Sequence, residues 1–164
     1  ELHLVAILWI MKFGYKLDAK FDSSCLGNRL ILNEDLRGVV NGSGLFKPYF
    51  AQYQKWRDTA VKEAQNKLDA GNKIAFINLD LKDYFYSVQL DFNEVERDVW
   101  GKDGYEDTSN VHHILKELYE RFTEKLSSKR LINHDINSNG IKKCVLPIGV
   151  ATSYIFGNYY INHT

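Results

Sequence analysis

The stretch FINLDLKDYFYSV, residues 76–88, decides how the chain is interpreted. Its first half is apolar, and we expect residues 74–79 to form a short buried strand that ends at Asp80. A lone carboxylate at the edge of a buried strand is costly unless it binds a cation. Asp83 and a run of three aromatic residues follow. The segment therefore predicts a metal site beside a pocket for a flat ligand.

Each of these residues also has an ordinary structural interpretation. Taken alone, Asp80 is a candidate helix cap or salt-bridge partner, and Phe85 is a candidate core aromatic. The functional interpretation depends on the order and spacing of these residues within the longer sequence.

The composition is that of a packed domain. The 164 residues are 45% hydrophobic, 26% charged and 13% aromatic, which excludes collagen-like, coiled-coil and disordered classes. Lys plus Arg and Asp plus Glu both number 21, so no net charge draws the chain to nucleic acid or to an anionic membrane. Cys25 and Cys144 lie outside any CxxC pattern, which predicts free thiols in an intracellular protein.

Targeting signals are not visible in the sequence. The most apolar stretch, residues 2–11, is too short to span a bilayer and lacks the features of an export signal. We therefore expect a cytoplasmic protein without a membrane partner. The chain begins at Glu1 and stops in an apolar run at Thr164, so we also expect it to be part of a longer protein.

Helical periodicity marks several other segments. Residues 2–17 predict an amphipathic helix with a buried apolar face, which consists of Leu4, Ile7, Leu8 and Met11. Residues 46–68 predict a long helix whose lysines either contact a phosphate backbone or form a solvated face. Further helices are expected over 108–127 and from Ala151 onward, and residues 92–100 form an acidic amphipathic segment.

The tryptophans and two adjacent histidines have structural interpretations. Trp9, Trp56 and Trp100 are expected in the core or between helices, with base stacking as the alternative. His112 and His113 point in different directions around a helix, which argues against a metal pair.

Two stretches resemble the motifs of a known family. LDLKDYFYSV, residues 79–88, resembles motif A of reverse transcriptases, in which a strand-end aspartate is followed five residues later by an aromatic. LPIGVATSYIFGNYYI, residues 146–161, resembles their motif B, in which a Leu-Pro-x-Gly loop opens a helix. The two motifs occur in the family's order.

Two upstream stretches extend the resemblance. SCLGNRL, residues 24–30, is similar to an element of bacterial retroelement enzymes, and LFKPYFAQYQKW, residues 45–56, looks most like the antiphage-defence and abortive-infection groups. The resemblance implies an α+β fragment of a polymerase right hand, with helices packed on a small, mainly antiparallel sheet. Residues 1–164 would be an incomplete reverse transcriptase domain, with a fingers-like helical part at 1–72 and a partial palm at 73–164.

The resemblance also implies roles for individual motif A residues. Asp80 would be the catalytic residue that holds two Mg²⁺ ions, with Mn²⁺ as a substitute, and Leu81 would add its backbone carbonyl. Asp83 and Tyr84 would present backbone amides to the triphosphate. Phe85 would be the steric gate that excludes a ribose 2′-hydroxyl.

Residues outside motif A complete the implied nucleotide site. Ile148 and Gly149 would lie beside the incoming nucleotide, and Arg29 is a weaker candidate for a triphosphate contact. Two positions depart from the family's pattern, because Ile148 stands where Gln is frequent and Tyr154 where Pro is usual. Both departures bear on templating and on substrate preference.

The implied function is part of an RNA-directed or non-templated DNA polymerase that acts in bacterial antiphage defence. Its partners would be an RNA template, a DNA product and dNTPs, with a non-coding RNA or a protein as further candidates. Motif C, which supplies the second metal-binding aspartate, would lie downstream of residue 161, so residues 1–164 alone are expected to be inactive. Two alternatives remain: a catalytically silent polymerase-like domain that binds RNA or a protein, and an unrelated interaction domain.

Overall fold

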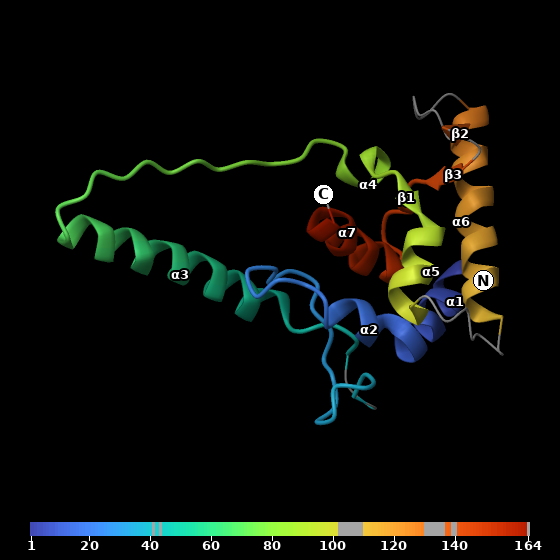
Figure 1. Ribbon diagram of the computed structural model, residues 1–164, viewed down its shortest axis with the longest axis horizontal. Helices are drawn as coiled ribbons and strands as arrows, with labels where there is room; N and C mark the ends of the chain where they lie inside the picture. The colour runs from blue at the N-terminus through green and yellow to red at the C-terminus, as the bar shows by residue number, and fades with distance from the viewer. Residues whose placement is uncertain (41, 43, 102–109, 130–136, 139–140, 164) are drawn as a thin grey trace.

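Figure 1 shows the computed structural model, in which a packed group of helices carries one long projecting arm. The structure describes residues 1–40, 42, 44–101, 110–129, 137–138 and 141–163. We call α3 together with residues 70–83 the arm, and the remainder the body. Among the described residues, no helix combines the length and the apolar character that crossing a bilayer requires.

Helices make up most of the described chain. They are α1 (Leu2–Trp9), the π-helical η1 (Ile10–Gly14), α2 (Tyr15–Asp18), α3 (Tyr49–Asp69), α4 (Tyr84–Ser87), α5 (Phe92–Trp100), α6 (Val111–Ser128) and α7 (Ala151–His163). The strands are β1 (Leu90–Asp91), β2 (Asn137–Ser138) and β3 (Ile141–Cys144). The helices expected at 46–68, 108–127 and from Ala151 are therefore present, with boundaries shifted by a few residues, and the amphipathic segment at 92–100 forms α5.

The sheet is small and antiparallel. Its strand order is β1-β3-β2, so β3 is the central strand. Leu90 of β1 pairs with Cys144 of β3. The expected α+β class is thus correct in its coarse form, as a mainly helical body with a small antiparallel sheet. Cys25 and Cys144 are free thiols, as the sequence predicts.

The first helical segment buries a different face from the one that the sequence predicts. Its buried side chains are Ala6, Trp9, Ile10, Phe13 and Leu17. The predicted face is exposed, at 69% for Leu4, 38% for Ile7, 48% for Leu8 and 43% for Met11. The residues of α1 are apolar on most of its sides, so periodicity alone does not select the side that is buried.

Aromatic rings from four helices form the centre of the body. Phe156 on α7 packs against Trp9 at 5.0 Å, Phe92 at 5.6 Å and Tyr119 at 5.7 Å between ring centroids. Because α1 packs on both α6 and α7, the first helix shares this core with residues that follow the arm. The division between 1–72 and 73–164 stays a prediction.

Residues 72–81 form neither a strand nor a helix, so the prediction of a buried strand at 74–79 is wrong. They run extended along the arm (Figure 1), and Ile77 and Leu79 are 83% and 84% exposed. The backbone of residues 73–81 makes no hydrogen bond to another described residue. An apolar run becomes a strand only beside a pairing edge, and the described strands pair with one another instead.

Candidate functional site

The two segments that resemble motifs A and B meet in the body. The backbone N–H of Leu146 donates a hydrogen bond of 2.9 Å to the carbonyl oxygen of Phe85. Phe85 lies in α4, at the end of the arm, and Leu146 lies in the loop that leads from β3 into α7. A contact between residues so far apart in sequence brings the predicted gate beside the predicted nucleotide loop.

The ring of Phe85 is half-buried and held by a second aromatic. Tyr154 meets it edge-on, with ring centroids 5.9 Å apart and an interplanar angle of 87°. Tyr154 makes the same kind of contact with Phe46, also at 5.9 Å. The residue that departs from the family's proline thus braces the predicted gate, a role that its position in the sequence did not reveal.

Tyr84 fastens α4 to α7. Its hydroxyl donates a 2.6 Å hydrogen bond to the carbonyl oxygen of Gly157, and burial raises the pKa of Tyr84 to about 12, so the donor keeps its proton. A Cβ at Gly157 would lie 3.2 Å from the Tyr84 ring, so even alanine there would require the ring to shift by a few tenths of an ångström. This contact orients the turn that carries Phe85.

Asp83 begins the turn of α4 in a left-handed backbone conformation, with φ of 53°. Its carbonyl oxygen accepts hydrogen bonds from the backbone N–H groups of Tyr86 and Ser87. The N–H groups of Asp83 and Tyr84 make no hydrogen bond to another described residue. Both amides are therefore available for the predicted contact with a triphosphate.

Gly149 occupies a backbone conformation that suits glycine. Its φ is +82°, and a Cβ built there would meet nothing within 4 Å. Ile148 beside it is 62% exposed. The loop therefore presents backbone toward open space, where a nucleobase could approach closely.

Asp80 and Leu81 lie exposed on the arm rather than at the edge of the sheet. Asp80 forms no hydrogen bond or ion pair with another described residue, and the described chain contains no group of three or more His, Cys, Asp or Glu side chains able to hold a metal. One carboxylate and one carbonyl suit Mg²⁺ that takes its remaining ligands from substrate phosphates and water. They do not by themselves make a two-ion centre.

Arg29 is engaged by the protein itself. Its guanidinium forms a two-pronged ion pair with the buried carboxylate of Asp18, with both N···O distances at 3.0 Å. Its remaining donors reach the carbonyl oxygens of Asp18, Cys25 and Asp22. All five N–H groups are thus used, and the predicted triphosphate contact would require one of these bonds to be exchanged.

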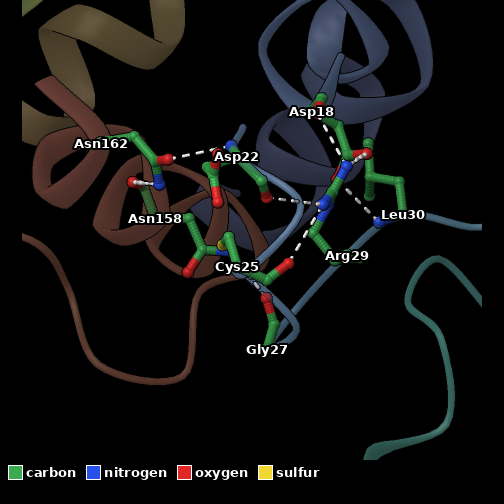
Figure 2. A network of polar contacts seen from close by, with 8 residues as sticks. All are labelled: Asp18, Asp22, Cys25, Gly27, Arg29, Leu30, Asn158 and Asn162. Carbon is green, nitrogen blue, oxygen red and sulfur yellow. Dashed lines mark hydrogen bonds and ion pairs between the residues drawn. The ribbon is translucent and has the colours of Figure 1, made fainter. Parts of the chain in front are cut away.

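The same network fixes the loop at residues 22–29. Figure 2 shows it joined to α2 through Arg29 and Asp18 and to α7 through two asparagines. Asn158 donates to the carbonyl oxygen of Gly27 at 2.7 Å, and the side chain of Asn162 accepts from the backbone N–H of Asp22. The loop is therefore held on both sides, although its sequence is typical of a free turn.

The three tryptophans differ in burial, which the sequence did not predict. Trp9 is fully buried and Trp100 half-buried, as expected, whereas Trp56 on α3 is 52% exposed. His112 is buried, accepts a hydrogen bond from the indole of Trp9 at 2.9 Å and faces Glu96 through its other nitrogen, and His113 is exposed. The two adjacent side chains thus point in different directions, as expected for neighbours on a helix.

Comparison with known proteins identifies no related protein. No protein-family model matches the sequence, and neither the curated proteins nor the solved structures yield a match. The resemblance to reverse transcriptases therefore rests on the sequence motifs alone.

Proposed function

We propose that this chain is the fingers and partial palm of a bacterial reverse transcriptase-like polymerase. The whole protein would transfer deoxynucleotides to a primer on an RNA template, or without a template, and would serve in antiphage defence. A non-coding RNA or a protein partner would complete the assembly.

One observation carries the proposal: the hydrogen bond between Leu146 and Phe85, which joins the segments resembling motifs A and B. A nucleotide site built from the two motifs needs these two stretches to lie side by side. The contact also sets the predicted gate against a loop whose glycine adopts a left-handed conformation. Both features are what a nucleotide site between these motifs requires.

The chain's own residues would perform three tasks in this site. The exposed carboxylate of Asp80 and the carbonyl of Leu81 would bind the metal, and the unused amides of Asp83 and Tyr84 would bind phosphate oxygens. The ring of Phe85, held by Tyr154, would exclude a ribose 2′-hydroxyl. When bound, magnesium supplies charge neutralisation of the triphosphate and activation of the primer hydroxyl.

The test is single-nucleotide extension by the full-length protein that contains this chain, with Mg²⁺ or Mn²⁺. We expect Asp80→Ala to reduce dNTP incorporation by roughly a thousandfold or more, because the metal loses its protein carboxylate. Phe85→Ala should raise the use of rNTPs relative to dNTPs by about tenfold or more, because the ring no longer occupies the space of the 2′-hydroxyl.

Glu34→Ala is the matched control, since it removes an exposed carboxylate from a loop outside the site. It should retain full incorporation. Wild-type activity in Asp80→Ala would contradict the proposal, as would a Phe85→Ala protein that excludes rNTPs as strictly as the wild type.

A second function is favoured by the isolation of Asp80 among the described residues. A polymerase-like domain that has lost catalysis would keep the contact between the motif segments and would bind RNA or a protein. In that case the wild type would bind nucleic acid but incorporate no nucleotide with either metal, and Asp80→Ala would change neither property.

A further inference from the structure

We propose that α3 carries a stacking site for the bases of single-stranded nucleic acid. The site consists of Tyr49, Tyr53 and Trp56, which we call the aromatic stripe, and the facing loop at residues 24–27. It lies outside the candidate nucleotide site and requires neither a metal nor catalysis. The proposal therefore holds whether or not Asp80 supports nucleotide transfer.

The rings of the stripe form a stepped row along one side of the helix. Tyr49 and Tyr53 are stacked, with centroids 5.9 Å apart and 28° between planes, and Trp56 follows Tyr53 at 5.7 Å and 40°. The spacing in sequence, four residues and then three, places all of them on one face of α3. A cavity of about 310 Å³ separates this face from the loop.

Packing does not account for these rings. Tyr49, Tyr53 and Trp56 are 77%, 46% and 52% exposed, and α3 buries no residue along its whole length. Exposed aromatic faces lose the stabilisation that burial would give them. A ligand with flat apolar faces and polar edges, such as a nucleobase, would cover the rings and still leave its edges for Gln52 and the loop.

The charges around the stripe favour a polyanion over an apolar protein partner. The first turn of α3 contains no acidic residue, and Lys47 and Lys55 form no ion pair with another described residue. By contrast, Arg57 is paired with Asp58 on the same helix. Lys47 precedes Tyr49 by two residues and Lys55 follows Tyr53 by two, so both are near the stripe in sequence, although neither lines the cavity. From such positions lysines can bind a phosphate backbone while the rings stack on its unpaired bases.

The exposed rings of the aromatic stripe favour binding of single-stranded over duplex nucleic acid. Bases within a duplex already stack on their neighbours, so their faces are not available to protein rings. A second copy of this chain is a poorer occupant, because it would bring the same lysines to the interface and oppose like charges.

The experiment measures binding of short oligo(dT) and oligo(U) to the chain through tryptophan fluorescence. Trp56 is the exposed reporter, since Trp9 is fully buried, so stacking at the stripe should quench the emission. We expect Tyr53→Ala to weaken binding by about tenfold, Tyr53→Phe to retain it, and a matched duplex to bind at least about tenfold more weakly than the single strand.

Phe50→Ala is the matched control, because Phe50 is a 69% exposed aromatic of the same helix that does not line the cavity. It should change binding less than about twofold. Asp80→Ala should leave oligonucleotide binding unchanged even where it abolishes nucleotide transfer, which separates this proposal from the polymerase proposal. Equal losses in Phe50→Ala and Tyr53→Ala, duplex binding as tight as single-strand binding, or a dimer that Tyr53→Ala dissociates would overturn the assignment.

Discussion

Asp98 lies where three segments of the body meet. Its carboxylate accepts hydrogen bonds from Lys20 at 2.7 Å and from the hydroxyl of Tyr159, and it pairs with His163 at 3.0 Å. Partial burial raises the pKa of Asp98, but the bonds from Lys20 and Tyr159 outweigh burial and lower the pKa below its usual value. The same carboxylate raises the pKa of Tyr159, after the larger effect of burial.

We predict that Asp98→Asn makes the free energy of unfolding fall less steeply as the pH is lowered into the acid range. A carboxyl whose pKa is lowered by folding contributes stability that is complete above its unfolded pKa of about 3.9 and is lost as the pH falls through the folded value. The variant should be about 1–2 kcal/mol less stable at neutral pH, and the difference should shrink below about pH 4.

The measurement is the free energy of unfolding in urea at several pH values. Asp58→Asn is the control. Asp58 is exposed on the arm, so its substitution should leave the pH dependence of the free energy of unfolding unchanged. A constant difference between Asp98→Asn and the wild type down to about pH 2 would contradict the assigned pKa shift.

The arm is the element that departs furthest from what the sequence predicts. Its helix forms where the periodicity of residues 46–68 predicts one, yet it packs no side chain into the body. Its extended part carries an apolar run whose composition is typical of a buried strand. The composition favours a strand, but a strand also depends on a partner that the described chain does not place beside it.

We predict that amide hydrogens of residues 73–81 exchange with solvent near the rate of an unstructured peptide. Their N–H groups make no hydrogen bond to another described residue, whereas those of α6 lie in a packed helix. Exchange in α6 should be slower by roughly a thousandfold or more. Hydrogen exchange read by mass spectrometry tests this, and strong protection of residues 73–81 would show that the segment is paired in solution.

Cohesion of the whole molecule comes from the aromatic centre rather than from the sheet. Phe156 contacts rings from α1, α5 and α6, and its side chain is fully buried. Tyr119 adds hydrogen bonds to Thr152 and Ser153, both at 2.8 Å, so α6 and α7 are also joined by polar contacts inside the core. Burial and dispersion at this centre hold together segments from both ends of the chain.

We predict that Phe156→Ala costs about 3–5 kcal/mol of unfolding free energy, because it leaves a cavity where three helices meet. Phe50→Ala removes the same side chain from an exposed site on the arm and should change stability by less than about 0.5 kcal/mol. Urea denaturation compares the two variants directly. Similar losses in both would mean that the arm is packed in solution.

Local sequence is enough to predict the longer helices, their approximate boundaries and the aromatic content of the core. Local periodicity and turn chemistry carry that information, since they depend on neighbours along the chain. The sequence also determined the candidate residues, because Asp80, Phe85 and Gly149 were identified through short motifs alone. The sequence suggests Arg29 as a phosphate ligand because it does not show that the Arg29 guanidinium forms an ion pair with Asp18.

Which surfaces are covered depends on the tertiary structure. It buried Ala6 and Ile10 instead of Leu4 and Leu8, left residues 74–79 without a pairing edge, and set Leu146 against Phe85. The physical reason is the same in each case: burial and strand pairing depend on partners that lie far away along the chain, and an apolar side chain or an open backbone does not specify which partner will reach it.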